Sequence, residues 1–194
     1  MRALVLLALA ACTPDIASGS YLCGPEGACP KGQACNGPDN TCVLTSTVQP
    51  FACAADLDFE PDNTATEAHA LTNLTCVTTP FSNNNCMPSG DTADWLKFTA
   101  PTNCIAVEVE ARLAFPVAFE ELGLELWDLD RNAKVADEAM CLQGADVGLE
   151  RRCLDFTLAG GTTYGIKVYP TGEGTCDGAC AYNRYLLGVQ LATP

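Results

Sequence analysis

The sequence predicts an all-β protein: an antiparallel β-sandwich or jelly roll preceded by a small disulfide-rich module. Two observations predict this class. Apolar and polar residues alternate in short segments of the second half, and four cysteines crowd a glycine- and proline-rich stretch near the N-terminus. A period of two is typical of strands that bury one face, and six or more such strands between turns are typical of sandwiches.

The N-terminus has the features of a secretory signal. Arg2 precedes an apolar run over residues 3–11, which is too short to span a bilayer comfortably. The sequence Leu9-Ala10-Ala11-Cys12 resembles the lipobox of bacterial lipoproteins, which implies cleavage before Cys12 and acylation of its sulfur. Several acyl chains give a stable anchor where one would be marginal. The alternative is an ordinary secretory signal that leaves Cys12 as a spare thiol.

The cysteine count agrees with the lipidated form. The chain has 13 cysteines, and lipidation of one leaves an even set for up to six disulfides, as in other exported chains. Thr13 rather than an aspartate follows the lipidated position, which by resemblance to lipoprotein sorting implies the outer membrane or cell surface of a Gram-negative bacterium. The expected disulfide cysteines are Cys23, Cys29, Cys35, Cys42, Cys53, Cys76, Cys86, Cys104, Cys141, Cys153, Cys176 and Cys180.

The net charge excludes one class of partner. At −14, the chain repels nucleic acid, and no basic patch offsets this charge. We therefore expect no nucleic acid partner. The expected contacts are the membrane, through the N-terminal lipid, and an extracellular polymer or protein.

Residues 23–42 form the cysteine-rich module. The spacing C-x5-C-x5-C-x6-C is too wide for a zinc knuckle, and the absence of C-x-x-C in it argues against a thioredoxin-like role. The module has too few large apolar side chains to form a hydrophobic core, and disulfides must therefore hold it together. Of the three pairings we favour Cys23–Cys35 with Cys29–Cys42. The segment resembles short cysteine-rich repeats of bacterial surface lipoproteins and half of an epidermal-growth-factor-like or knottin-like module.

The chain divides into five expected parts. The predicted parts are a signal peptide at 1–11, a lipidated tether at 12–22, the cysteine-rich module at 23–42, a linker at 43–55 and the sandwich at 56–191. Within the sandwich, strands are predicted at 94–100, 104–112, 123–130, 153–159, 164–170 and 182–191. The segment 64–72 is the one place where a helical turn or two is expected.

Three motifs follow one another in the second part of the chain, at Asp58–Thr64, Gly90–Phe98 and Leu158–Val168. In this order they resemble the bacterial pre-peptidase C-terminal domain, a jelly-roll module of secreted proteases and cell-surface proteins, and the resemblance covers 56–191. The family's EPND occurs here as EPDN, and the segment Thr75–Ser89 looks like an insertion. Eight added cysteines are expected to staple surface loops. Among them we favour a local Cys76–Cys86 pair.

The resemblance also implies a calcium site. In the related collagen-binding domains of secreted collagenases, calcium lies where the first segment crosses the loop before the aspartate-rich strand. Hard oxygen donors of this kind suit Ca²⁺. The residues carried over by motif are Asp58, Glu60, Asp62, Asn63, Asp91 and Asp94. The alternative is that Asp62 and Asn63 cap a turn and Asp94 starts a strand.

Catalytic chemistry has little support in the sequence. His69 is the only histidine, and there is no GxSxG, HExxH or phosphate-binding glycine loop. We therefore expect no enzyme activity and no organic cofactor. Packing is the expected role of His69.

Two aromatic residues are candidates for a ligand-binding surface. Trp127 lies opposite Leu124 and Leu126 in the alternating pattern, and Tyr169 lies opposite Tyr164, Ile166 and Val168. The expected function is a non-catalytic cell-surface binding or structural module that is stabilised by calcium. The alternative is an accessory or inhibitory partner of an exported protease.

Overall fold

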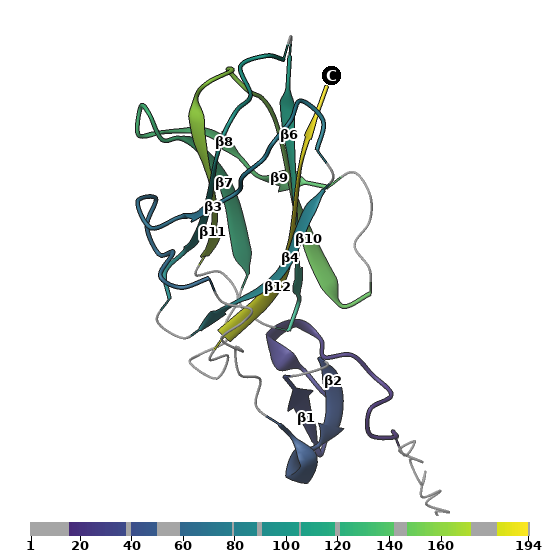
Figure 1. The fold of residues 1–194 in the computed structure, drawn as a ribbon. Helices are drawn as coiled ribbons and strands as arrows, with labels where there is room; N and C mark the ends of the chain where they lie inside the picture. Colours follow the sequence, from purple (N-terminus) through teal and green to yellow (C-terminus); the bar gives the residue numbers. More distant parts are fainter. Residues whose placement is uncertain are drawn as a thin grey trace, which may run out of the picture.

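A computed structural model describes residues 16–37, 40–49, 59–78, 80–88, 91–104, 106–118, 121–141, 147–171 and 182–193. A small unit at residues 16–49, here called the knob, lies at one end of a β-sandwich that begins at residue 59 (Figure 1). The all-β fold class is confirmed, because the regular elements of the described residues are strands apart from two short 3-10 turns. The described residues contain no helix long and apolar enough to cross a bilayer.

The knob is a two-stranded antiparallel hairpin held by crossed disulfides. Its elements are η1 (Pro25–Gly27), β1 (Gln33–Asn36), β2 (Thr41–Leu44) and η2 (Thr45–Thr47). Cys23 is bonded to Cys35 and Cys29 to Cys42, which is the pairing favoured above. Cys23 and Cys42 are buried, so the sulfurs themselves form the centre of the knob.

The knob includes residues on both sides of the cysteine-rich segment. Gln33 Nε2 donates a hydrogen bond of 2.7 Å to the Ile16 carbonyl oxygen, and Gly19 N donates to the Cys42 carbonyl oxygen at 2.8 Å. On the other side, Gln49 N donates to Asn36 Oδ1 at 2.8 Å. Parts of the expected tether and of the expected linker are therefore folded into the knob.

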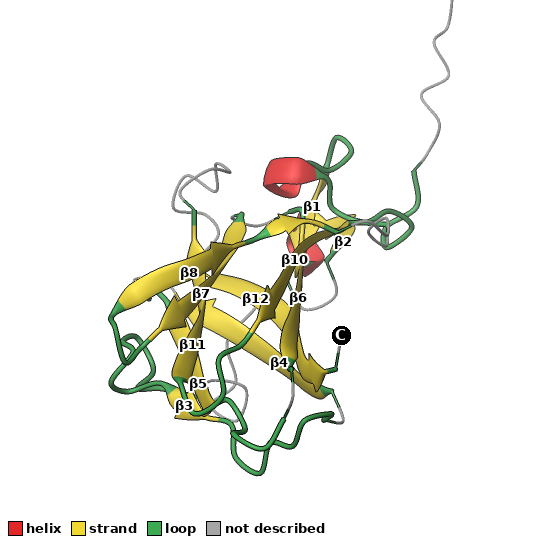
Figure 2. Cartoon of the chain, turned by 90° about the horizontal axis from the view of Figure 1, so that it is seen from above, coloured by secondary structure: helices red, strands yellow, loops and turns green. Residues whose placement is uncertain are grey.

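The sandwich has two five-stranded sheets that face each other (Figure 2). The first sheet has the order β4 (Phe81–Pro88), β12 (Tyr182–Ala192), β6 (Glu108–Pro116), β10 (Leu149–Thr157) and β9 (Ala139–Met140). The second has the order β3 (His69–Ala70), β5 (Asp94–Thr99), β11 (Thr163–Pro170), β7 (Leu122–Asp128) and β8 (Ala133–Asp137). Neighbouring strands are antiparallel, except that β3 runs parallel to β5.

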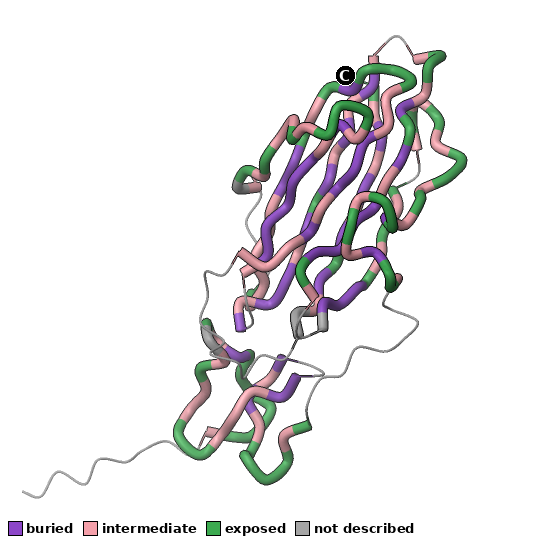
Figure 3. The backbone as a smooth tube through the Cα atoms, turned by 90° about the vertical axis from the view of Figure 1, so that its left-hand side faces the viewer, coloured by how far each residue is buried: buried purple, intermediate pink, exposed green. Residues whose placement is uncertain are grey.

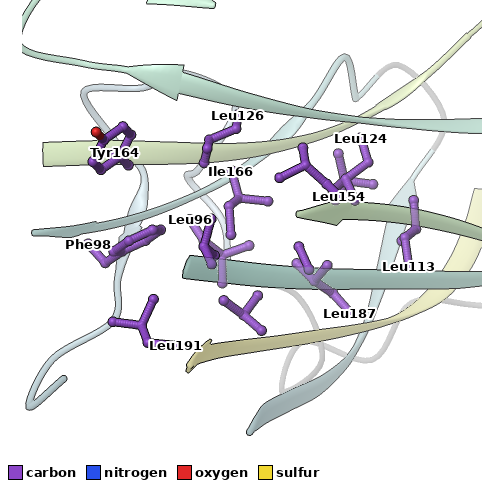
Figure 4. Close-up of a cluster of buried hydrophobic side chains, with 14 of the residues drawn as sticks. Leu96, Phe98, Leu113, Leu124, Leu126, Leu154, Tyr164, Ile166, Leu187 and Leu191 are labelled. Carbon is purple, nitrogen blue, oxygen red and sulfur yellow. The ribbon is translucent and has the colours of Figure 1, made fainter. Parts of the chain in front are cut away.

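Alternation along the strands places the apolar side chains between the two sheets. On β6, Val109, Ala111, Leu113 and Phe115 are all buried, whereas the residues between them are more accessible. Buried stretches run along the facing strands in Figure 3. Figure 4 shows how side chains from both sheets interdigitate in this core; the labelled ones are Leu96, Phe98, Leu113, Leu124, Leu126, Leu154, Tyr164, Ile166, Leu187 and Leu191.

Three sequence-based expectations about the sandwich are wrong. Residues 64–72 form no helix but a single turn followed by β3. The presumed insertion contains β4, a full edge strand of the first sheet. Cys76 is bonded to Cys104 rather than to Cys86, because Cys86 lies on β4 while the chain before β4 runs along the other end of the sandwich.

The other cysteines of the sandwich that the structure describes are also in disulfides. Cys141 is bonded to Cys153, and Cys86 is disulfide-bonded as well. Cys12, Cys53, Cys176 and Cys180 lie outside the described residues, and so does the proposed signal peptide.

The knob packs directly against the end of the sandwich where β6 ends and β10 begins. Ala118 is fully buried in a cluster with Cys23 and Cys42. Gly148 has a φ of +79°, and a Cβ atom there would lie 2.8 Å from Leu22 Cδ1. The absence of a side chain at Gly148 therefore allows Leu22 of the knob to lie against the sandwich.

Candidate functional site

Backbone pairing brings two of the predicted acidic segments together. Trp95 N at the start of β5 donates a 3.0 Å hydrogen bond to the Asp62 carbonyl oxygen. Thr92 N donates to Asn63 Oδ1 at 3.4 Å. The 60–63 segment therefore lies along residues 91–95, as the proposed calcium site requires. Asp58 lies outside the described residues.

Asp94 is the centre of this acidic cluster, which we define as Glu60, Asp62, Asp91 and Asp94. Its side chain is fully buried. Tyr185 Oη from β12 donates a hydrogen bond to Asp94 Oδ2, and Asn85 Nδ2 from β4 donates to the same atom at 3.3 Å and to Tyr185 Oη at 3.1 Å. One carboxylate oxygen of Asp94 is thus held by the opposite sheet.

The other oxygen of Asp94 faces the remaining acids. Asp94 Oδ1 and Asp91 Oδ2 are both buried, and within the described part of the chain neither accepts a hydrogen bond from an N–H group. The two carboxyl groups hydrogen-bond each other, which requires a proton on one of them. Asp91 Oδ1 accepts a 3.3 Å hydrogen bond from Ala93 N. Buried carboxylate oxygens without donors are rare in proteins and call for a compensating proton or cation.

Burial and like charge raise the pKa values in the cluster. Loss of hydration raises the pKa of Asp94 to about 9, with further contributions from the charges of Asp62 and Asp91, although the Tyr185 hydrogen bond opposes the shift. Burial also raises the pKa of Asp91, and the charge of Glu60 adds to that effect. The cluster therefore holds a proton at neutral pH when no cation is bound.

The cluster fits Ca²⁺ in charge and in donor type. Asp62, Asp91 and Asp94 supply the hard carboxylate oxygens that calcium prefers. No three carboxylates of the described residues place ligand atoms within 4.8 Å of one another, so the groups would have to draw together around an ion. Within the described residues, the one set of three potential metal ligands this close together is Cys23, Cys29 and Cys42, and their sulfurs are already in disulfides.

Two predicted calcium ligands have other partners in the structure. Both carboxylate oxygens of Glu60 accept hydrogen bonds from Asn63 Nδ2 at 2.9 Å, and Glu60 Oε2 also accepts from Asp62 N at 3.1 Å. The side-chain oxygen of Asn63 accepts from Thr92 N. Asn63 therefore joins the 60–63 segment to residues 91–95. Its hydrogen bonds with Glu60 also stabilise the turn, as the turn-capping alternative predicts.

Asn85 and Tyr185 were not identified from the sequence. Tyr185 lies at an inward position of β12, where a tyrosine needs a partner for its hydroxyl, and this is a signal that alternation offers. Asn85 lies in the asparagine-rich β4, whose local sequence carries no comparable signal. His69, by contrast, lies apart from these hydrogen bonds and stacks on Phe59 with ring centroids 4.0 Å apart.

The predicted ligand-surface residues lie on the outer face of the second sheet. Trp127 is half-buried against Trp95, with ring centroids 5.9 Å apart, and its Nε1 donates a 2.9 Å hydrogen bond to Glu125 Oε2. Tyr169 is also half-buried, and Lys167 Nζ lies 4.5 Å from its ring centroid. The two aromatics point outward as the alternation predicts, but they form a packed layer rather than an open row.

The ring of Tyr169 lies directly over Gly123 of β7. A Cβ atom at position 123 would come within 2.6 Å of the ring. Gly123→Ala should therefore destabilise the sandwich by about 1–3 kcal/mol, because the ring must move out of its packed position. Urea unfolding measures this cost. In a Tyr169→Ala background the same glycine substitution should be nearly neutral, and an equal cost in both backgrounds would contradict the contact.

Comparison with known proteins gives similarities to solved structures but no match by sequence. No family model matches the chain, and no curated protein matches it significantly. Among solved structures, it is similar to the pre-peptidase C-terminal domain of a collagenase from Bacillus anthracis. The identity is 15%, the TM-score is 0.42, and the match covers 63% of this chain and 93% of that chain. A similarity this distant transfers neither function nor site to the chain.

Proposed function

We propose that this chain is a non-catalytic lipoprotein of the bacterial cell envelope, whose sandwich binds an extracellular polymer or protein and is stabilised by Ca²⁺. The acidic cluster carries the calcium part of this proposal. Among the described residues, Asp94 Oδ1 and Asp91 Oδ2 are buried carboxylate oxygens without an N–H donor, and Asp62 is a further buried acid beside them. Calcium would supply a positive charge to the Asp91 and Asp94 oxygens.

The residues of the cluster have distinct roles in this proposal. Asp62, Asp91 and Asp94 would hold the ion, while Tyr185 and Asn85 fix the orientation of the Asp94 carboxylate. Glu60 and Asn63 hold the 60–63 segment against β5. A bound ion would therefore join the segment that enters the sandwich to both sheets, which is a stabilising role and not a catalytic one.

The outer face of the second sheet is the proposed contact for a polymer or protein. Trp127 and Tyr169 lie there beside Lys167 and Glu125, so that aromatic surface and charge alternate. Lys167 Nζ is 3.7 Å from Glu125 Oε2, and half-buried aromatic rings next to such polar groups suit glycan or extended-peptide ligands.

Calcium titration of chelator-treated protein tests the calcium part of the proposal. We expect heat of binding by calorimetry and a rise in melting temperature that grows with calcium, with stabilisation of about 2.7 kcal/mol at 100 times Kd. The response should be larger at pH 8 than at pH 6, because binding must displace the proton of Asp94.

Matched variants localise the effect. Asp91→Asn should abolish the calcium response, whereas Asp137→Asn, at an exposed acid paired with Lys134, should retain it. The calcium proposal would be contradicted if millimolar calcium gave no heat of binding and no rise in the melting temperature.

A further inference from the structure

Exposed apolar side chains are concentrated on the knob. Six large hydrophobic side chains of the described residues are strongly exposed, and three of them, Tyr21, Leu22 and Leu44, belong to the knob. Leu22 lies against Gly148 of the sandwich. Tyr21 and Leu44 are 53% and 51% exposed, although the knob has hardly any apolar core. Exposed apolar groups gathered on so small a unit indicate a contact surface.

The tether between the proposed lipid and the knob is very short. The knob is tied from Ile16 onward, since the Ile16 carbonyl accepts a hydrogen bond from Gln33 Nε2 and Ser18 Oγ accepts one from Leu44 N at 3.1 Å. Three residues lie between Cys12 and Ile16, and the four Cα-to-Cα steps span no more than about 14 Å when fully extended. A lipid on Cys12 therefore keeps the knob at or near the headgroups.

The distribution of charge favours the same orientation. Residues 16–49 carry only Glu26, Lys31 and Asp39, so that nearly all of the −14 of the chain lies in the sandwich. An anionic bilayer surface repels the sandwich and scarcely repels the knob. Both the tether and the charge therefore turn the knob toward the membrane.

We infer that the knob rests on the lipid surface, with Tyr21 and Leu44 among the headgroups. This inference rests on the proposed lipidation of Cys12. Tyrosine suits such a place because its ring is apolar and its hydroxyl is hydrated, and such residues gather at membrane interfaces. The knob is then a membrane-contacting foot rather than a free spacer.

The contact between the knob and the sandwich links the position of the foot to the orientation of the sandwich. Ala118 and Gly148 of the sandwich pack against the knob, so that the foot also sets the orientation of the sandwich. The C-terminal end of the chain lies at the opposite end of the molecule from the knob, and would point away from the bilayer (Figure 1).

Site-specific photo-crosslinking tests the foot. Benzoylphenylalanine is placed singly at positions 21, 44 and 77 of the lipidated chain, in vesicles of phosphatidylethanolamine and phosphatidylglycerol. Val77 is the matched control, because it is 61% exposed but lies on the sandwich, next to Thr78, whose N–H bonds to the Leu191 carbonyl at 3.0 Å. Mass spectrometry should find lipid adducts at 21 and 44 and none at 77.

The other outcomes separate the two proposals. An intact mass that shows acylated Cys12, together with adduct levels at 21 and 44 no higher than at 77, would overturn the foot and leave the anchor standing. Adducts to protein instead of lipid would overturn the foot as well, in favour of a protein partner. A mass without acyl chains would overturn the anchor and the foot together.

Discussion

Replacing Asp94 with asparagine should make the metal-free protein more stable at neutral pH, not less. The buried acid retains its proton in the folded chain up to a pKa of about 9, whereas an unfolded aspartate loses it near pH 4. Folding at neutral pH must therefore recover that proton, at a cost of up to about 4 kcal/mol. An asparagine amide has the shape of the protonated acid and requires no proton.

The pH dependence follows from the same difference. Between about pH 4 and pH 9 the unfolded state binds fewer protons at this residue than the folded state, so that the contribution of Asp94 to the free energy of unfolding falls as pH rises. The slope is up to about 1.4 kcal/mol for each pH unit, and Asp91, whose pKa is also raised, changes in the same direction. Chemical denaturation at pH 5, 6, 7 and 8 in chelator should show this slope for the wild type and a shallower one for Asp94→Asn.

An exposed aspartate supplies the control. Asp137→Asn removes a surface ion pair with Lys134 and should change stability by less than about 1 kcal/mol, with the wild-type slope retained. In calcium the wild type should gain stability and Asp94→Asn should not. A variant less stable than the wild type at pH 7 in chelator would contradict the buried, protonated Asp94.

Loss of one knob disulfide should unfold the knob and leave the sandwich folded. In Cys29→Ala/Cys42→Ala, the knob loses a link worth about 2–5 kcal/mol, and almost nothing else holds its centre. The backbone amide at position 42, which in the wild type donates to the Tyr21 carbonyl at 2.7 Å, should then exchange rapidly with solvent. Hydrogen-exchange mass spectrometry resolves this loss in peptides from the knob.

A disulfide of the sandwich gives the opposite result. Cys76→Ala/Cys104→Ala opens a loop with a sequence separation of 28, and should destabilise the sandwich by about 3–4 kcal/mol while knob amides stay protected. If loss of the knob disulfide also unfolded the sandwich, the contacts of Ala118 and Gly148 would have to be much stronger than their small size indicates.

Alternation along the chain predicted most of the sandwich, because each long inner strand buries one face. The segments 104–112 and 123–130 overlap β6 and β7, and the inward positions of Leu124 and Leu126 are as expected. The edge strands were missed. β4 contains three successive asparagines, and its buried Asn85 is held by hydrogen bonds rather than by apolar packing. A polar residue with a distant partner has no local signature.

The candidate site was only partly predictable for a similar reason. Its acids stand close together in the sequence, so composition and motif order identify them. The position of the Asp94 carboxyl group depends on Tyr185 and Asn85, which bind it from the opposite sheet, and Tyr185 is 91 residues away in the sequence. Likewise, Trp127 is on the predicted face of the sheet, but Trp95 covers part of its ring. Alternation predicts the face on which a side chain lies and does not predict which side chains cover it.

The buried centre of the knob is completed by Ala118, a residue that lies far from the knob in the sequence. Ala118 follows Cys42 by 76 residues, and yet it belongs to the buried cluster of the knob. Because synthesis proceeds from the N-terminus, all four cysteines of the knob are in the chain well before the residue that covers them is added. The contact with Ala118 can therefore form only after the end of β6 has been synthesised. A knob grafted onto another protein would lack this contact and expose its sulfurs to reductants.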